Sequence, residues 1–379
     1  MHPGCSRFKQ TTMNLLHYFW LLPLCFSPQS HAQIKPVTPI NDEVIVEKLG
    51  PRVAKPPTGT DVVPAVRDAI LLARRNADPR YLGQAQALIG AQWSSPEASY
   101  DMATLQATIE QSRHEFAAAS KTLRAALTKP APSYAQALLT LATIERVQGN
   151  YAKALEACQS IDAAAAQLYA QACRFETISL QGQWDAARQG FAQLLRTQRL
   201  PIQQAWLHSL MAENEERAGQ SDQALKLYAL SLAGDADGYT ALAYADALLR
   251  QGKPALAVAA LQSQPSSDSV LIRRAAAYKS MGDAQWQTLA EEIRRRFAAS
   301  AQRGGSQAGH AREQAQFELL VLGDAKAALA AAQANLQLQR EPLDWWLAVQ
   351  SANQSGQTGE AAKLLASAAK QGLKDMRLK

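Results

Sequence analysis

The chain has 379 residues, of which 47% are hydrophobic and only 7% aromatic, a composition that favours helices packed on small side chains and disfavours a sheet protein. Its net charge of +6 is weak for this length and falls to about +4 without Arg7 and Lys9 of the leader. The basic run at residues 294–296 is diluted by Glu291 and Glu292, so no concentrated basic stripe is present and no nucleic-acid partner is expected.

Residues 1–32 have the features of a secretory signal peptide. Arg7 and Lys9 give a positive start, and residues 15–26 form an apolar core that is too short to span a bilayer. Small residues stand three and one before a cut that follows Ala32. We therefore expect cleavage there, no membrane span in the mature chain, and a periplasmic or secreted protein. A leucine rather than a small residue precedes Cys25, which disfavours lipid anchoring at that cysteine.

Residues 33–60 are rich in proline and glycine and are expected to form an extended linker. Helical periodicity begins near residue 61. It predicts a first helix hairpin joined at residues 80–83 and a second joined at residues 114–116. Neither join has a glycine at the expected turn position, so these two hairpins are atypical.

Seven glycines then recur at spacings of 30 to 41 residues, and an alanine stands five residues after all of them except Gly282, which has Gln287 there. Glycine tolerates positive φ, so each one is predicted to end a helix and reverse the chain, and the alanine lets the second helix lie close to the first. One hairpin cannot bury its apolar face alone, so this period indicates a solenoid of helix pairs. With positions 80 and 114 counted as turns, nine pairs are expected. The turn glycines are Gly149, Gly182, Gly219, Gly252, Gly282, Gly323 and Gly356.

The longest spacing, from Gly282 to Gly323, contains a glycine-rich loop at residues 304–309. Helix pairs are expected over residues 61–303 and again over 310–379. The loop either lies within one stack or separates two shorter solenoids.

Two cysteines, Cys158 and Cys173, remain in the mature chain and are expected on neighbouring helices. Axes of packed helices usually lie about 8–10 Å apart, which stretches disulfide geometry. The sequence therefore favours buried free thiols, with a disulfide as the alternative.

The repeats resemble the tetratricopeptide repeat, most clearly where Leu141 and Ala142 precede Gly149, Tyr151 and Ala154. The resemblance covers about residues 62–370. It implies an all-α, right-handed superhelical solenoid of eight or nine helix-turn-helix repeats and, with the leader, an exported bacterial protein of this type. The departures from the family pattern, at a position where the family prefers a small residue, are Phe175, Gln316 and Val349.

The resemblance also implies that two rows of side chains face a concave groove and bind a protein or peptide partner. Six residues before three successive turn glycines stand Glu176, Glu213 and Asp246. Thirteen residues before the same glycines stand Tyr169, Trp206 and Tyr239. Trp346, in the last repeat, is a further candidate for the groove, and its neighbour Trp345 is expected in the core. The alternative interpretation is that the rings pack between helices and the acids only keep the surface soluble.

The mature chain contains no recognisable catalytic or metal-binding sequence pattern. His114, His208 and His310 are too far apart in sequence for a metal-ligand pair on one helix, and no nucleophile, phosphate-loop or cofactor motif occurs. We expect no enzyme activity, no catalytic residue, no cofactor and no metal. The predicted function is a protein-interaction scaffold or adaptor in the cell envelope. The alternative is a structural spacer or stalk subunit of an envelope assembly or export complex.

Overall fold

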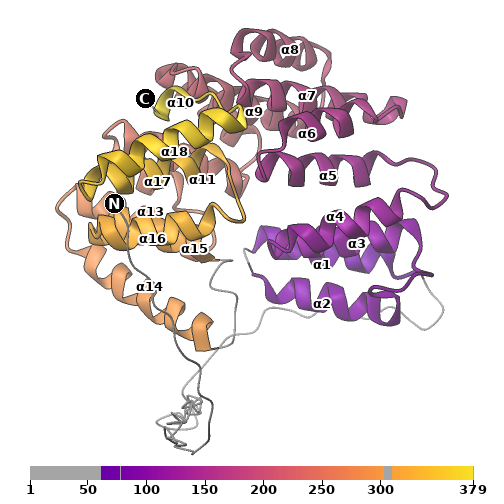
Figure 1. Cartoon of the computed structure of the whole chain (residues 1–379), viewed down its shortest axis with the longest axis horizontal. Coiled ribbons are helices and arrows are strands. Elements are labelled where there is room, and N and C mark those ends of the chain that lie inside the picture. The colour runs from indigo at the N-terminus through magenta and orange to yellow at the C-terminus, as the bar shows by residue number, and fades with distance from the viewer. Residues whose placement is uncertain (1–60, 77, 303–309, 379) are drawn as a thin grey trace, which may run out of the picture. The chain divides into compact units, whose positions relative to one another are not determined.

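The computed structural model describes residues 61–76, 78–302 and 310–378, and every regular element in that part of the chain is helical (Figure 1). Its eighteen α-helices form nine successive pairs, so the predicted all-α solenoid of helix-turn-helix repeats is confirmed. The predicted signal peptide, the linker and the glycine-rich loop at 304–309 lie outside the described residues.

The two helices of each pair are separated by a short turn, and successive pairs contact each other along the chain. The pairs are α1 (Val63–Arg75) with α2 (Arg80–Ile89), α3 (Tyr100–Ser112) with α4 (Phe116–Ala126), α5 (Ala135–Val147) with α6 (Tyr151–Gln159), α7 (Gln167–Leu180) with α8 (Trp184–Thr197), α9 (Pro201–Arg217) with α10 (Ser221–Gly234), α11 (Gly238–Arg250) with α12 (Pro254–Ala260), α13 (Asp268–Ser280) with α14 (Gln285–Gln302), α15 (Ala311–Gln316) with α16 (Ala325–Asn335), and α17 (Pro342–Gln354) with α18 (Thr358–Gln371). Short helical turns also occur at η1 (Gly90–Gln92), η2 (Ala164–Ala166), the π-helical η4 (Phe317–Leu322) that continues α15, and η5 (Met376–Leu378).

The turns between paired helices use a left-handed residue, as the glycine spacing predicts. All seven turn glycines have φ between +67° and +87°, and His114 takes the same conformation with φ of +62°. The first join differs from its prediction at 80–83, because Arg80 already begins α2. The Asp78 carboxylate accepts the Arg80 backbone N–H, and Pro79, which has no N–H to leave unpaired, suits the start of a helix.

Small residues allow the paired helices to lie close together. The alanines that follow six of the turn glycines are all buried, at 0 to 3% exposure. After Gly282 the pattern is displaced, because Gln287 is exposed and Ala290 is the buried alanine of α14. Ile272 and Ile293, before the undescribed loop, pack in one hydrophobic cluster with Phe317 and Val321 after it.

Phe175 of α7 occupies a position where a small residue was expected, and its bulk is accommodated by the partner helix. A Cβ added at Gly190 of α8 would lie only 2.3 Å from Cζ of the Phe175 ring. The ring also meets Phe191 edge to face, with centroids 5.7 Å apart. The large side chain on one helix is therefore matched by a missing side chain on the other.

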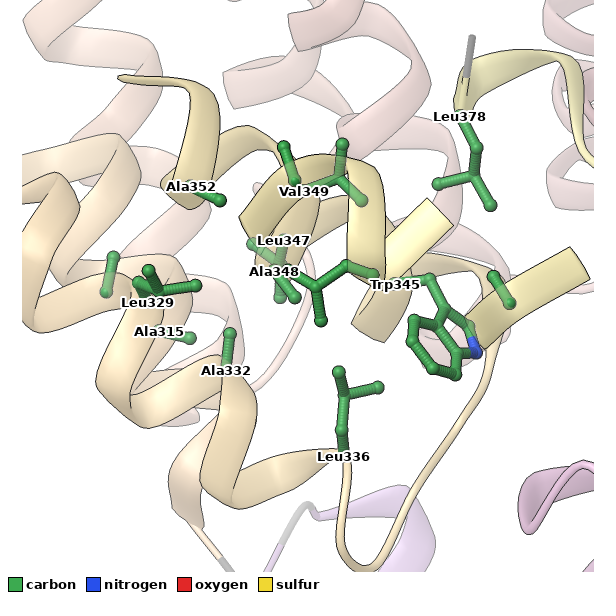
Figure 2. Packing of buried hydrophobic residues seen from close by; sticks show 14 of the residues in the cluster. Ala315, Leu329, Ala332, Leu336, Trp345, Leu347, Ala348, Val349, Ala352 and Leu378 are labelled. Carbon is green, nitrogen blue, oxygen red and sulfur yellow. The ribbon is translucent and has the colours of Figure 1, made fainter. Parts of the chain in front are cut away.

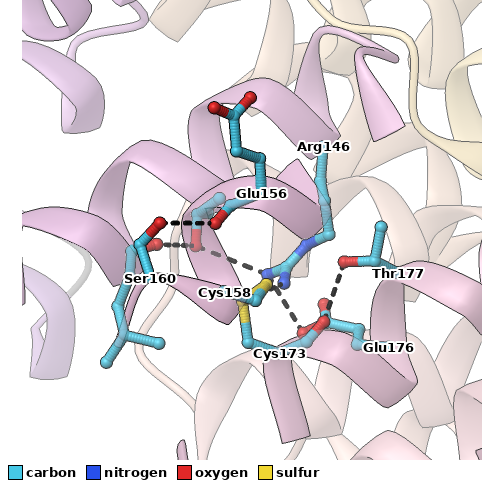
Figure 3. Close-up of a disulfide and its surroundings, with 9 residues drawn as sticks. Arg146, Glu156, Cys158, Ser160, Cys173, Glu176 and Thr177 are labelled. Atoms are coloured by element: carbon cyan, nitrogen blue, oxygen red, sulfur yellow. Dashed lines mark hydrogen bonds and ion pairs between the residues drawn. A yellow bond between two sulfur atoms is a disulfide. The ribbon is translucent and has the colours of Figure 1, made fainter. Parts of the chain in front are cut away.

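Cys158 and Cys173 form a disulfide between α6 and α7, so the prediction of free thiols is wrong (Figure 3). Their Cα atoms are 5.8 Å apart, an ordinary distance for a disulfide, because each Cα stands about 2.3 Å from its helix axis and facing Cα atoms lie closer together than the axes do. The cysteines share a cluster with Ala142 and Ala157, whose short side chains let the helices approach. Cys158 is also the penultimate residue of α6, just before the connection to α7.

The last repeats contact the middle of the chain as well as their sequence neighbours. Their core, which contains Leu329, Trp345 and Leu378 (Figure 2), also includes Tyr151 and Leu180 from the turns of the third and fourth pairs. The backbone N–H of Arg340 donates to the carbonyl of Val147 at 2.7 Å. Trp345 is buried in this core, as expected.

Among the described residues, no helix combines the length and the apolar character that crossing a membrane requires.

We predict opposite effects of alanine at two helical glycines. Gly190→Ala will lower the free energy of unfolding by about 1–3 kcal/mol, because the added methyl collides with Phe175. Gly83→Ala in α2 will raise it by about 0.5–1 kcal/mol, because an added Cβ there meets nothing within 4 Å and alanine is the better helix former. Chemical denaturation of both variants measures this, and equal effects at the two sites would contradict the packing described for Phe175.

We also predict that the disulfide stabilises the third and fourth pairs. The two cysteines are 15 residues apart, so reduction will lower the free energy of unfolding by about 3 kcal/mol through the entropy of the unfolded chain. Thermal unfolding with and without dithiothreitol tests this, with the Cys158→Ala/Cys173→Ala variant as control, because it has no bridge to reduce. An unchanged wild-type melting temperature after reduction would show that the bridge is absent.

Candidate functional site

A cavity of about 380 Å³ runs along the inner side of the array. Its walls come mainly from the first helices of seven successive pairs, namely α5, α7, α9, α11, α13, α15 and α17, and are completed by Tyr151 of α6, Tyr228 of α10 and Arg377 of η5. Because equivalent helices face the same space, residues at equal offsets from the turn glycines meet there. This is the geometry that the sequence repeat implies for a groove.

Four of the seven candidate partner-binding residues line this cavity. They are Glu176, Glu213, Tyr239 and Asp246. Tyr169 and Trp206 are not part of the cavity wall but contact each other, with ring centroids 5.4 Å apart. Trp346 is half-buried and packs against the core of the last repeats, outside the cavity lining. The acidic row therefore lies together in one place, whereas the aromatic row does not.

Each carboxylate of the acidic row is paired with an arginine of the chain itself. Arg146 of α5 reaches Glu176 of α7 at 3.0 Å, and Arg273 of α13 reaches Asp246 of α11 at 2.6 Å. The third acid, Glu213, pairs with Arg217 one turn along α9 at 3.2 Å. Buried charges are tolerated when they are paired in this way, so the row is not a strip of free negative charge.

The formal charges that the described residues contribute to the cavity lining balance. The arginines are Arg146, Arg217, Arg250, Arg273, Arg312 and Arg377. The carboxylates are Glu176, Glu213, Glu216, Asp246, Glu313 and Glu341. Sequence reasoning identified the acids as a row but did not assign their partners. Arg146 and Arg273 come from neighbouring first helices and Arg217 from the same helix as its acid, and equal offsets from the turn glycines do not tell which acid each arginine reaches.

Glu216 is the carboxylate with the most partners. It accepts from Arg250, from Arg377 at 3.1 Å and from the Tyr228 hydroxyl at 2.9 Å. Burial opposes ionisation of this group, but the two guanidinium groups prevail and hold the pKa of Glu216 below its ordinary value. It is therefore a permanently charged centre at neutral pH.

Two other groups of the cavity are shifted toward their neutral forms. Burial raises the pKa of Glu176 despite its pairing with Arg146. The charge of Glu213, together with burial, raises the pKa of the Tyr239 hydroxyl well above its ordinary value. The Tyr239 hydroxyl donates to Glu213 Oε1 at 2.8 Å while 61% of the residue is exposed. Its ring is thus held by one polar contact and offers an apolar face to solvent.

In the part of the chain that the structure describes, no three His, Cys, Asp or Glu side chains are grouped so that they could hold a metal ion. His114 lies instead in the contact between early and late repeats, with its Nδ1 2.9 Å from the Gln339 amide nitrogen. The cavity offers paired hydrogen-bond donors and acceptors and exposed ring surface, a combination suited to binding a polar chain.

No protein-family model matches the sequence, and no curated protein is similar to it in sequence. Solved structures do match its fold. A Rap protein, determined in complex with competence and sporulation factor, has a TM-score of 0.51 and 10% identity, with 82% of this chain and 98% of that chain covered. A tetratricopeptide repeat protein from Parabacteroides merdae has a TM-score of 0.33 and 14% identity, covering 78% of this chain and 98% of that one. The P58(IPK) tetratricopeptide repeat domain has a TM-score of 0.24 and 12% identity, covering 83% and 95%. The likeness to the Rap protein shows that the two chains share a fold, and at 10% identity it shows no more than the fold.

The pKa shift of Glu216 predicts a pH-dependent contribution to stability. Because its folded-state pKa is lowered, the ionised carboxylate stabilises the fold at neutral pH, and this contribution is lost as the pH falls through the folded-state pKa. Glu216→Gln will lower the free energy of unfolding by about 3 kcal/mol at pH 7, and the difference from wild type will shrink on acidification.

Denaturation between pH 7 and pH 3 measures this difference. Glu291→Gln is the matched control, because its side chain is 61% exposed and pairs only with Arg294 on the same helix. A Glu216→Gln penalty that stays constant across this range would contradict the lowered pKa.

Proposed function

We propose that this chain is a non-enzymatic protein-interaction scaffold of the cell envelope that binds a segment of a polypeptide partner in its cavity. The observation that carries the proposal is the continuity of the cavity across the first helices of seven pairs. A wall built from equivalent helices repeats similar contacts along its length, which suits a chain-like ligand better than a compact one.

The chemistry of the wall supports a polypeptide ligand. Arginines and carboxylates alternate across neighbouring helices, so backbone N–H and C=O groups of a bound segment find acceptors and donors at every step. Because these charges already pair with one another, the affinity for a partner depends less on the partner's net charge than it would if the acidic row were unpaired. Tyr239, 61% exposed, adds ring surface at the cavity, and aromatic side chains often contribute most to interface energy.

The Rap protein of similar fold was determined as a complex with a second molecule, which supports a binding role for this chain. The proposed location in the envelope rests on the secretory leader that the sequence predicts for residues 1–32. The disulfide between Cys158 and Cys173 agrees with it, since disulfides persist in oxidising compartments such as the periplasm.

A structural spacer is the second candidate, and one observation favours it. Leu230 and Leu256, on the second helices α10 and α12, are each 54% exposed and offer apolar contacts on helices outside the cavity wall. A spacer would bind its neighbours through such side chains and would leave the cavity unused.

Alanine substitution separates the two candidates. Tyr239→Ala will reduce the amount of partner retained from an envelope extract at least tenfold, because the ring is the most exposed apolar surface of the cavity. Leu256→Ala, which also truncates an exposed apolar side chain, will change retention less than twofold. Quantitative affinity capture with both variants measures this.

The reverse pattern, with loss of the partner in Leu256→Ala only, would refute groove binding and favour the spacer. Circular dichroism of each variant confirms that the helices are intact before capture. A photo-crosslinking residue placed at 239 or at 256 then reports which surface the retained partner touches.

A further inference from the structure

The C-terminal segment, residues 372–378, and the adjoining Gln371 lie across the turns of three successive middle pairs. The clearest sign is the space that an added Cβ would meet at their turn glycines. An added Cβ would collide with Gln371 Cδ at Gly149, would lie 2.9 Å from Lys374 Cβ at Gly182, and would lie 3.2 Å from Met376 Cβ at Gly219. The turn glycines that face nothing within 4 Å are Gly252, Gly282 and Gly356. The three turns therefore form a track that the C-terminal segment follows.

Both polar and apolar contacts hold the segment on this track. The backbone N–H of Lys374 donates to the carbonyl of Leu180 at 2.8 Å, and the Gln371 side chain donates to the Tyr151 hydroxyl at 2.9 Å. Leu373 and Leu378 are buried in the same cluster as Tyr151 and Leu180. The segment thus binds as a short peptide would, with one main-chain bond and two apolar anchors.

The segment forms an ion pair with Glu216 through Arg377, and each of these two residues also has another partner. Arg377 donates to Glu216 at 3.1 Å and also pairs with Asp375 of its own segment at 2.5 Å. Glu216 keeps Arg250 and the Tyr228 hydroxyl as partners if Arg377 leaves. Release of the segment therefore leaves no buried charge unpaired, and unpaired buried charge is what makes most buried ion pairs costly to break.

We propose that the C-terminal segment is an exchangeable occupant of the partner site, and that the partner peptide takes its place. This inference rests on the proposed function and adds the identity of the competing ligand. The partner that fits has the chemistry of residues 373–378, with two apolar side chains five residues apart and an arginine immediately before the second. Its arginine replaces Arg377 on Glu216, and its apolar anchors replace Leu373 and Leu378 in the hydrophobic cluster that includes Tyr151 and Leu180.

The test uses a fluorescent synthetic peptide with the sequence of residues 372–379 and the full chain. In wild type the tethered segment acts at an effective concentration on the order of millimolar and competes with the peptide. The Arg377→Ala/Leu378→Ala chain has a weakened segment and an intact track. It will bind the peptide at least tenfold more tightly than wild type, measured by fluorescence anisotropy.

Two matched substitutions at turn glycines test whether the peptide binds on the track. Added to the weakened chain, Gly182→Ala will abolish peptide binding, because its methyl occupies the place of the lysine side chain. Gly252→Ala introduces the same positive-φ strain at a turn that nothing approaches, and it will leave binding unchanged. A peptide with alanine in place of its arginine will bind at least tenfold more weakly.

Equal binding by wild type and the weakened chain, or binding by neither, would overturn the proposal, as would equal effects of the two glycine changes. Should the weakened chain fail to fold, hydrogen exchange of the wild-type chain replaces it. Millimolar peptide will then speed exchange of the amides of residues 373–378 at least threefold, and unchanged exchange would equally overturn the proposal.

The two proposals fail in different ways. If the peptide never displaces the segment but Tyr239→Ala still loses the captured partner, groove binding stands and the segment is a fixed part of the fold. If the peptide displaces the segment but Tyr239→Ala retains the partner, the segment is exchangeable and the captured partner binds elsewhere.

Discussion

The register shared by successive helix pairs is the constraint on which the cavity and its ion pairs depend. A single pair cannot bury its apolar face, so each pair stacks on the next in the same frame. The frame aligns the first helices of seven pairs around one space, where arginines and carboxylates of neighbouring helices come within bonding distance. Charged groups that are largely withdrawn from water are stable only as pairs. Burial in this wall therefore requires the positive and negative charges to balance and fixes the position of each side chain.

Sequence reasoning succeeded where the physical signal is local and repeated. A glycine at each turn reports a positive φ that other residues rarely adopt, and the observed angles at Gly149 and its equivalents follow from it. The same frame predicted that Glu176, Glu213 and Asp246 lie in one row, and all three line the same cavity.

Sequence reasoning failed where the outcome depends on a distance between two helices. The average separation of helix axes argued against a disulfide, but facing Cα atoms lie closer together than the axes, and Cys158 and Cys173 are placed facing each other with their Cα atoms 5.8 Å apart. The arginine partners depend on how neighbouring helices are placed, and the track of the C-terminal segment depends on contacts between distant parts of the chain, for which a single sequence has no periodic signal.

Contacts between distant repeats set this chain apart from an open solenoid, in which each repeat touches only its neighbours. Residues that are more than 160 positions apart meet at Glu216 and Arg377, and about 220 positions separate Tyr151 from Gln371. The stability of the middle pairs is therefore tied to the last pair. Leu373 and Leu378 of the C-terminal segment are buried in the core of the last repeats together with Tyr151 and Leu180 of the middle pairs.

Two ion pairs of the last repeats differ in how easily they can be broken. Arg312 is held by Asp344 and Glu341, and Asp344 has no exposed side-chain surface, so breaking that pair strands a buried carboxylate. Release of Arg377 leaves no buried charge unpaired, because Asp375 moves with it and Glu216 retains two other hydrogen-bond donors. The first contact is thus fixed because Arg312 is the charged partner of the buried Asp344, while the second combines a shared ion pair of Arg377 with two leucines and a backbone hydrogen bond. A ligand that supplies equivalent apolar anchors can replace the second contact without disturbing the first, which separates occupancy of the track from the integrity of the array.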